Sequence, residues 1–342
     1  MQSKMSKTIL VTGGTGFIGS WVVKYLLEEG NTVRLTLRNK GNKAKYEFLE
    51  SIAIKSGAKL EIWEADLLKE GCFDEAAAGC DMIYHLASPF ILKFSDAEKE
   101  LILPALKGTE NVLNAATKSK TVKRIVLTSS VAAIFGDNAD MKEQGLKEFT
   151  EANWNTSSSA THQQYSYSKT LAEKRAWEME KSQSQWSLVV INPSFVIGPS
   201  LEKSSNSGSL QFMNDLISGK YRMGAPNLEF SFVDVRDVAK AHILAAENTK
   251  TKGRFIIAAQ ELSMVELVKI IENAYPKKFK LPLMTAPKFS LFLVGWAFGL
   301  SNKFIARNVG HNISINSTKS KVELGIDYYP IEESVKDMIK TL

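Results

Sequence analysis

The stretch "KTILVTGGTGFIGSWVVKYLLEEGNTVRLTLR", residues 7–38, decides the fold. Residues 7–12 are mostly aliphatic or β-branched, as expected of a buried strand. From 17 to 29 apolar residues recur at helical spacing, and Gly30 ends that pattern. Residues 32–38 have the composition of a second strand. Because the whole unit is about thirty residues long, it predicts a strand–helix–strand crossover between parallel strands.

Four glycines, Gly13, Gly14, Gly16 and Gly19, occupy the predicted turn between the first strand and the helix. They fit G-x-G-x-x-G from Gly14 and G-x-x-G-x-x-G from Gly13. In either register, glycines permit positive φ in a tight turn, let the backbone approach a pyrophosphate and let the helix pack on the strand. The turn therefore predicts dinucleotide binding, and a glycine-rich connection without a ligand is the alternative.

The residues after the second predicted strand distinguish NAD from NADP. An acidic residue there would bind the ribose 2′-hydroxyl of NAD, but "LRNKGNKAK", residues 37–45, contains none. Arg38 and Lys45 offer a guanidinium and an ammonium to a 2′-phosphate. We therefore expect NADP(H), with Arg38 as the main contact and Lys45 as the second. A solvated basic loop is the alternative.

Further predicted strands at 59–66, 81–89, 122–130 and 187–193 alternate with helical stretches. This alternation predicts an α/β fold, a Rossmann-like doubly wound parallel sheet that binds its ligands at the carboxyl ends of the strands. Asp66 ends one of these strands, where it would contact the adenine or cap the next helix, and both interpretations stay open.

We expect two parts in the chain. Residues 1–193 plus about 231–259 would form the dinucleotide-binding Rossmann domain. Residues from about 194 to 230 and from 260 to 342 would form a smaller, discontinuous C-terminal substrate lobe. Its apolar composition favours aromatic or alkyl carbonyl substrates over sugars. Within it, the serine-rich stretch 200–210 is interpreted as a loop.

A tyrosine–lysine pair stands in "HQQYSYSK", residues 162–169. Tyr165 and Lys169 are four residues apart and share one helix face, whereas Tyr167 faces nearly the opposite way. A reductase needs a proton donor for its carbonyl, and an ammonium beside a phenol lowers the pKa of that phenol. Ser130, at a strand end, can stabilise the developing charge on the substrate oxygen. His85 lies inside a predicted strand and is interpreted as a core histidine.

With these pieces in place, the chain resembles the extended short-chain dehydrogenase/reductase family from about residue 7 to the C-terminus. The motifs that carry the resemblance are "TGGTGFIG" (12–19), "DL" (66–67), "HLASP" (85–89), "TSS" (128–130), "YSYSK" (165–169) and "NPSFVIGP" (192–199). The likeness is greatest to the branch of dihydroflavonol reductases, cinnamoyl-CoA reductases and carbonyl (methylglyoxal, aldehyde) reductases. "SKTLAEKRAWE" and "FVDVRDVAKAHILAAE" carry this narrower likeness.

The resemblance implies the catalytic triad Ser130, Tyr165 and Lys169 and the glycine register 13, 16 and 19. Tyr165 would protonate the carbonyl oxygen, and Lys169 would lower the pKa of Tyr165 and bind the nicotinamide ribose. The expected cofactor contacts are Gly13, Thr15, Gly16, Phe17, Ile18, Gly19, Arg38, Lys45, Asp66, Leu67, Leu86, Ala87, Ser88, Thr128, Tyr165, Lys169, Pro193, Ser194 and Val196. The expected substrate contacts are Pro89, Phe135, Phe195, Phe212 and Tyr221. No metal site is expected.

The chain also departs from the named members of that branch. Dihydroflavonol reductases carry an asparagine shortly after the serine, where this chain has Phe135. Cinnamoyl-CoA reductases carry an "NWYCYGK"-type signature, and this chain has "QQYSYSK". A broader aldehyde or ketone reductase therefore fits better. A nucleotide-sugar epimerase or dehydratase and a non-catalytic NADP-binding regulator are the alternatives; Arg38 and the apolar lobe argue against the first, and the Tyr–Lys pair argues against the second.

Composition limits the partners. The 342 residues include 43 Lys and Arg against 37 Asp and Glu, with no basic run of five, so we expect no nucleic acid. The N-terminal stretch has no signal-peptide pattern, which favours the cytoplasm. The apolar run "FSLFLVGWAFGL" (289–300) is too short to span a bilayer. We expect it to form a buried helix or a pocket wall, with a membrane-surface role as the alternative. The expected partner is a small carbonyl compound, without a membrane, and the chain would be a monomer or homodimer.

Overall fold

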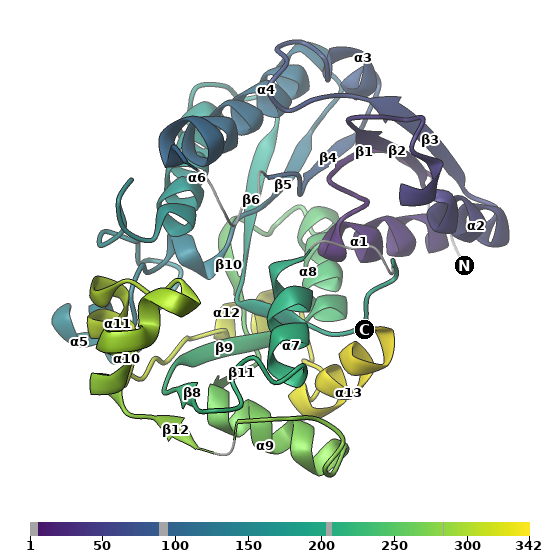
Figure 1. Cartoon of the computed structure of the whole chain (residues 1–342). Helices are drawn as coiled ribbons and strands as arrows, with labels where there is room; N and C mark the ends of the chain where they lie inside the picture. Colours follow the sequence, from purple (N-terminus) through teal and green to yellow (C-terminus); the bar gives the residue numbers. More distant parts are fainter. Residues whose placement is uncertain (1–5, 89–94, 203–206, 283) are drawn as a thin grey trace.

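The computed structural model describes residues 6–88, 95–202, 207–282 and 284–342 (Figure 1). Its central sheet has seven strands in the order β10-β6-β5-β4-β1-β2-β3, and all neighbouring strands are parallel. The strands are β1 (Thr8–Thr12), β2 (Thr32–Leu37), β3 (Lys59–Glu64), β4 (Met82–His85), β5 (Arg124–Thr128), β6 (Ser187–Pro193) and β10 (Gly253–Ile257). The order reverses between β1 and β4, and this confirms the predicted Rossmann-like, doubly wound sheet.

Helices cover both faces of this sheet. On one face, α1 (Phe17–Glu28) contacts α2 (Glu47–Ser56) and α8 (Val235–Glu247). On the other, α4 (Leu103–Ser119) contacts α3 (Asp74–Ala77) and α6 (Gln164–Lys181) (Figure 1). Neighbouring side chains of β1 point to opposite faces, so Ile9 and Val11 join the first core and Leu10 joins the second. Shorter turns are η1 (Lys43–Lys45), η2 (Glu98–Ile102), η3 (Val131–Ala133) and α5 (Ala139–Glu143).

A smaller assembly stands at the carboxyl ends of these strands. Its three-stranded sheet has the order β11-β9-β7, from β7 (Phe195–Ile197), β9 (Glu229–Asp234) and β11 (Gln260–Ser263). Residues 231–234 therefore belong to this sheet, although the sequence groups them with the Rossmann domain. A two-stranded pair joins β8 (Ala225–Pro226) to β12 (Thr285–Ala286). The helices are α7 (Gly208–Ile217), α9 (Met264–Ala274), α10 (Lys288–Val294), η4 (Gly295–Phe298), α11 (Asn302–Asn308), α12 (Thr318–Glu323) and α13 (Ile331–Thr341).

The apolar run 289–300 does not form the buried helix that its composition suggests. It breaks into α10 and η4, and Phe289, Leu293 and Trp296 are 73%, 72% and 79% exposed. Apolar residues occur all round this segment, and a helix at the surface can bury only one side, here Leu291 and Gly295. In the part of the chain that the structure describes, no helix combines the length and apolar character needed to cross a bilayer.

Candidate active site

The glycine turn follows directly from the end of β1. Gly13 has φ +70°, and a Cβ there would lie 2.6 Å from the backbone nitrogen of Ala87. A Cβ on Gly19 would collide with the carbonyl oxygen of Gly13, so the first turn of α1 packs directly on the loop. The backbone N–H of Gly16 donates to the Gly13 carbonyl at 3.0 Å and closes the turn. Glycine is therefore required at 13 and 19, and the turn leaves the N-terminus of α1 facing the pocket described below.

The basic residues after β2 lie in two different environments. Arg38 is exposed just beyond the end of the strand. Lys45, in η1, forms an ion pair with Glu202 at 3.4 Å, so a phosphate at Lys45 would share the ammonium with this carboxylate. Asp66 accepts a hydrogen bond from the Leu68 N–H at 2.9 Å and stabilises a local turn; it does not cap α3, which begins at Asp74.

Two buried threonine–histidine pairs support the strand ends beside the turn. His85 bonds Thr12 at 2.7 Å, and burial, with the nearby Lys169 charge, lowers the pKa of His85 to about 3, so it is a satisfied core histidine as predicted. His242 contacts the Val238 carbonyl through Nδ1 at 2.7 Å and Thr128 through Nε2 at 2.6 Å. Burial lowers the pKa of His242 to about 4, so the ring is neutral and its one proton is on Nδ1. Thr128 must then donate to His242, which leaves its oxygen as an acceptor.

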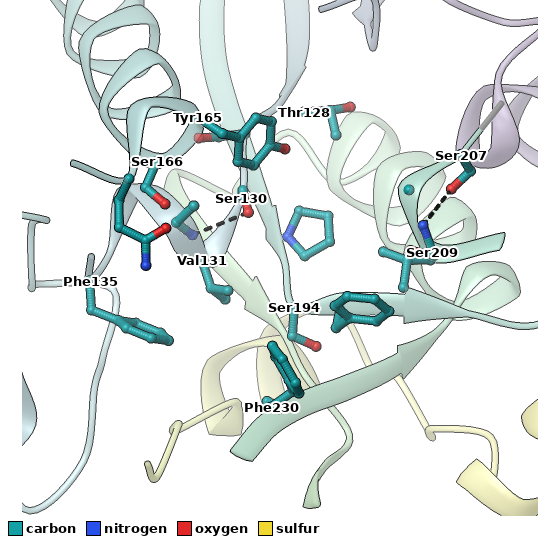
Figure 2. A pocket seen from close by; sticks show the side chains of 18 of the residues that line it. Thr128, Ser130, Val131, Phe135, Tyr165, Ser166, Ser194, Ser207, Ser209 and Phe230 are labelled. Atoms are coloured by element: carbon teal, nitrogen blue, oxygen red, sulfur yellow. Dashed lines mark hydrogen bonds between the residues drawn. The ribbon is translucent and has the colours of Figure 1, made fainter. Parts of the chain in front are cut away.

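Ser130, Tyr165 and Lys169 come together where β5 meets α6. Ser130 Oγ accepts from the Ala132 N–H at 3.1 Å (Figure 2). Its side chain also hydrogen-bonds Tyr165 and lowers the pKa of that phenol. The Lys169 ammonium lies 5.9 Å from the centre of the Tyr165 ring. The ring is 36% exposed and lines the pocket, whereas Lys169 is buried behind it.

The pKa of Tyr165 moves in the opposite direction from the prediction. Burial raises it to about 12, and the hydrogen bond from Ser130 counteracts only part of that rise. Burial also lowers the pKa of Lys169 to about 8, against the charge of Glu173, which favours the ammonium. The phenol therefore keeps its proton at neutral pH, as a proton donor must.

A buried ion pair supports this triad from below. Glu173, one helical turn beyond Lys169, pairs with Arg254 at 2.6 Å. Asn192 donates to Glu173 at 2.8 Å and to the Ser130 carbonyl at 3.1 Å. The same carboxylate thus connects α6 with β6 and β10 and fixes the backbone of Ser130.

A pocket of about 540 Å³ joins the glycine turn, the Ser130–Tyr165 wall and the small sheet. Figure 2 shows Tyr165 beside Ser130, with Ser194 and Phe230 below them and Ser207 and Ser209 across the cavity. The expected contacts that line it are Gly13, Gly16, Phe17, Ile18, Gly19, Leu86, Thr128, Ser130, Phe135, Tyr165, Pro193, Ser194, Phe195 and Val196. The expected residues that lie outside its lining are Thr15, Arg38, Lys45, Asp66, Leu67, Ala87, Ser88, Lys169, Phe212 and Tyr221.

The two aromatic residues outside the lining have other partners. Phe212 packs edge-on against Phe195 with ring centres 5.1 Å apart, and Tyr221 stacks on Phe298 at 6.1 Å. Pro89 lies outside the described residues. In the described chain, the run 289–300 does not contribute to the pocket wall either.

Several polar residues of the pocket were missed from the sequence. They are Asn138, Gln163, Ser166, Ser207, Ser209, Glu229, Ser231 and Asn308, and the lining also includes Ser129, which the sequence set aside in favour of Ser130. Ser207 caps α7, at the end of the stretch interpreted as a loop. Asn308 comes from α11, far along the chain, where no motif marks it. Within the described residues, the buried hydroxyls of Ser129, Ser194 and Ser231 have no hydrogen-bond partner. These hydroxyls are free to contact a ligand in the pocket.

Known proteins share both the sequence and this geometry. The model of the NAD dependent epimerase/dehydratase family matches residues 9–258. Cinnamoyl-CoA reductase CAD2 of Medicago truncatula is 36% identical over 99% of this chain and 97% of its own length. Gre2 of Candida albicans, solved in complex with NADPH, is 34% identical, covers 98% of both chains and has a TM-score of 0.78. Yeast methylglyoxal/isovaleraldehyde reductase Gre2, also complexed with NADPH, is 27% identical, with a TM-score of 0.80 over 98% of this chain and 97% of its own.

Proposed function

Since the chain belongs to the NAD dependent epimerase/dehydratase family, within the extended short-chain dehydrogenases/reductases, we propose that it reduces an aldehyde or ketone to an alcohol with NADPH. The observation that carries the proposal is the position of Tyr165 and Ser130 on the wall of a pocket that begins at the glycine turn. A proton donor and a dinucleotide cradle in one cavity are what carbonyl reduction needs.

The residues of the pocket fit NADP(H). Gly13 and Gly19 leave a cradle that a Cβ would fill, and the Ser194 hydroxyl is a buried polar atom available to a ligand. When bound, the dihydronicotinamide supplies the hydride for the substrate carbon. We assign the 2′-phosphate to Arg38, the adenosine side to Asp66 and Leu67, and the nicotinamide side to the family motifs at Thr128 and Pro193–Val196. We likewise propose that residues 1–193 with about 231–259 form the dinucleotide-binding domain and that about 194–230 with 260–342 form the substrate-binding lobe.

The chain's own groups would carry the proton. Tyr165 keeps its proton at neutral pH and donates it to the carbonyl oxygen, while the Ser130 hydroxyl donates a hydrogen bond to the same oxygen. The Lys169 ammonium, held beside Tyr165 by the turn of α6, would stabilise the phenolate that remains. Glu173 favours the charged form of Lys169 and fixes the Ser130 backbone through Asn192.

The substrate side of the pocket is aromatic. Phe195 and Phe230 have ring centres 5.5 Å apart, and Phe135 stacks on buried Phe149 at 4.3 Å. Such a wall favours an apolar aldehyde or ketone over a sugar. The likeness to a methylglyoxal/isovaleraldehyde reductase supports the same class of substrate.

The test is consumption of NADPH, followed by absorbance, against a panel of aromatic and aliphatic aldehydes and ketones. We expect turnover with several members of the panel and slower turnover with NADH, because Arg38 has no 2′-phosphate to bind there. A UDP-sugar incubated with NAD serves as the control for an epimerase or dehydratase. Turnover of the UDP-sugar without reduction of any carbonyl compound would refute the proposal.

A further inference from the structure

The surface around α10 carries both apolar side chains and an unusual charge distribution. We define the α10 face as Met223, Met284, Phe289, Leu293, Trp296 and Phe298, all of which are exposed. These residues come from three segments that lie together. The N–H of Ala225 donates to the Met284 carbonyl at 3.0 Å, and Tyr221 stacks on Phe298. The segments that carry these exposed side chains therefore lie side by side, so the apolar residues gather in one region of the surface.

The α10 face is held rigidly by the helix behind it. A Cβ on Gly295 would lie 2.8 Å from Ile305 of α11, so η4 packs closely on that helix. Lys288 donates to the carbonyls of Ala306 and Val309 at 3.0 and 2.7 Å. Figure 1 shows α10 and α11 together at the edge of the molecule, away from the central sheet. The exposed side chains thus belong to a fixed support.

The segment of the sequence that contains α10 has basic residues but no acidic ones. Residues 273–322 contain eight Lys and Arg and no Asp or Glu, whereas the other residues contain 35 Lys and Arg against 37 Asp and Glu. The whole net charge of +6 thus comes from this segment. Lys303 is exposed in the first turn of α11, and Lys280 lies against the turn at Gly219 that precedes Met223. Exposed cations therefore flank the α10 face.

We propose that the α10 face docks on an anionic phospholipid bilayer, with Phe289, Leu293 and Trp296 entering the interface. Aromatic and leucine side chains flanked by lysines are the chemistry of interfacial binding, in which burial of apolar area adds to attraction by acidic headgroups. The indole N–H of Trp296 already donates to the Leu293 carbonyl at 3.1 Å, which lowers the cost of removing it from water. This proposal takes up the membrane-surface role that the sequence left as the alternative for residues 289–300.

A second copy of the chain is a less suitable partner for the α10 face than an anionic bilayer. A two-fold contact places the same patch against itself, and here it would bring the exposed Lys280 and Lys303 of both copies to one interface. Like charges at such an interface repel, whereas acidic headgroups attract them.

The test uses the full-length protein and vesicle co-sedimentation, with phosphatidylcholine alone and with an equimolar mixture of phosphatidylcholine and phosphatidylglycerol. We expect binding to the anionic vesicles that weakens as salt is added. The combined variant Phe289→Ser, Leu293→Ser, Trp296→Ser should bind at least about tenfold more weakly, because each side chain no longer buries apolar area. Ile54→Ser, at an 81% exposed residue of α2, is the matched control and should bind like the original chain.

Three results would overturn the proposal: no binding to the anionic vesicles, equal binding of the triple variant, or self-association of the original chain that the triple variant loses in analytical ultracentrifugation. The last result would assign the face to a second copy. None of these measurements requires turnover, so their outcome is independent of the proposed reduction.

Discussion

At the cofactor end of the pocket, the wall consists of backbone at the glycine turn and the strand ends, and its residues are neighbours in the sequence or in the parallel sheet. At the lobe end, the wall consists of side chains such as Phe304 and Asn308, which come from α11. The helix α11 is held in place by Asp137, whose carboxylate accepts hydrogen bonds from Asn308 at 2.7 Å and from Arg307 at 2.6 Å. Substitutions should therefore disrupt the two ends of the pocket by different causes. At the cofactor end the cause is a steric collision or the loss of a charge, and at the lobe end it is the loss of one buried carboxylate.

Asp137 is the common point of the lobe end. It is fully buried and also contacts His162, which precedes α6, at 2.8 Å. Burial alone would raise its pKa, but hydrogen bonds from Asn308, His162 and Arg307 outweigh it and hold the pKa of Asp137 below its usual value. One side chain thus links α11 to the loop that follows Ser130 and to His162, just before the helix α6 that carries Tyr165.

The largest effect is expected at Lys169, to which we assign a part in both catalysis and cofactor binding. Lys169→Met should lower kcat/KM for a carbonyl substrate by about 10²–10⁴, because the phenolate would lose its adjacent ammonium. The original chain should lose kcat/KM as pH rises through about 8, where Lys169 gives up its proton. Lys181→Met, exposed at the end of the same helix, is the control and should keep full activity. An unchanged kcat/KM in Lys169→Met would remove this residue from the mechanism.

At the lobe end, Asp137→Asn should reduce the free energy of unfolding by about 3 kcal/mol, because Arg307 and His162 lose a buried partner. Asp74→Asn breaks an exposed pair with Lys118 and should change the free energy of unfolding far less than Asp137→Asn does. Urea unfolding measures both. NADPH affinity should be nearly unchanged in Asp137→Asn, since the cofactor end is built separately. A parallel loss of NADPH affinity would show that the two ends are not independent.

At the cofactor end, Arg38→Ala should weaken NADPH binding by roughly 10- to 100-fold and leave NADH binding unchanged. This loss corresponds to the free energy of one charge-assisted hydrogen bond to the 2′-phosphate. Stability should not change, because Arg38 is exposed. Isothermal titration with both nucleotides is the measurement, with Lys55→Ala on α2 as the control. Equal losses for NADPH and NADH would assign the 2′-phosphate to another residue.

A pH effect on stability is expected at Asp237, at the start of α8 between the two parts of the chain. Burial raises its pKa from 3.8 to about 7, and its one hydrogen bond given by the structure comes from the Tyr329 N–H at 2.8 Å. Between about pH 4 and 7 the folded chain keeps a proton that the unfolded chain has lost. Stability from this group therefore falls as pH rises, by about 1.4 kcal/mol per unit.

Asp237→Asn should remove this dependence and keep the bond to Tyr329. Urea unfolding should be measured at about pH 5 and about pH 8. Relative to the original chain, the variant should have a higher free energy of unfolding at about pH 8 than at about pH 5. An equal difference at both pH values would mean that Asp237 ionises normally in the folded chain.

Much of the cofactor end could be predicted from the sequence, because its physics is local. Positive φ at Gly13 and the close contact at Gly19 are requirements of one turn, and a strand end is visible from a few residues. The pKa of Tyr165 could not be predicted, because burial depends on the whole pocket and here outweighs the hydrogen bond from Ser130.

Most of the lobe end could not be predicted from the sequence, because its contacts join residues that are far apart in the chain. Asp137 and Arg307 are 170 residues apart, and no spacing rule connects them. Apolar composition in 289–300 indicated burial, but composition does not reveal how many sides of a helix the fold can cover. Phe212 and Tyr221 were expected to contact the substrate and lie outside the pocket lining, because which aromatic rings face the cavity depends on how the small sheet is packed.

The central claim, that Tyr165 delivers the proton in a reduction driven by NADPH, is tested most directly by Tyr165→Phe beside Tyr167→Phe. We predict that Tyr165→Phe binds NADPH as the original chain does but reduces carbonyl compounds about 10²–10⁴ times more slowly. Tyr167→Phe, two residues along α6, should retain activity. Full carbonyl reduction by Tyr165→Phe, or an equal loss in both variants, would contradict the claim.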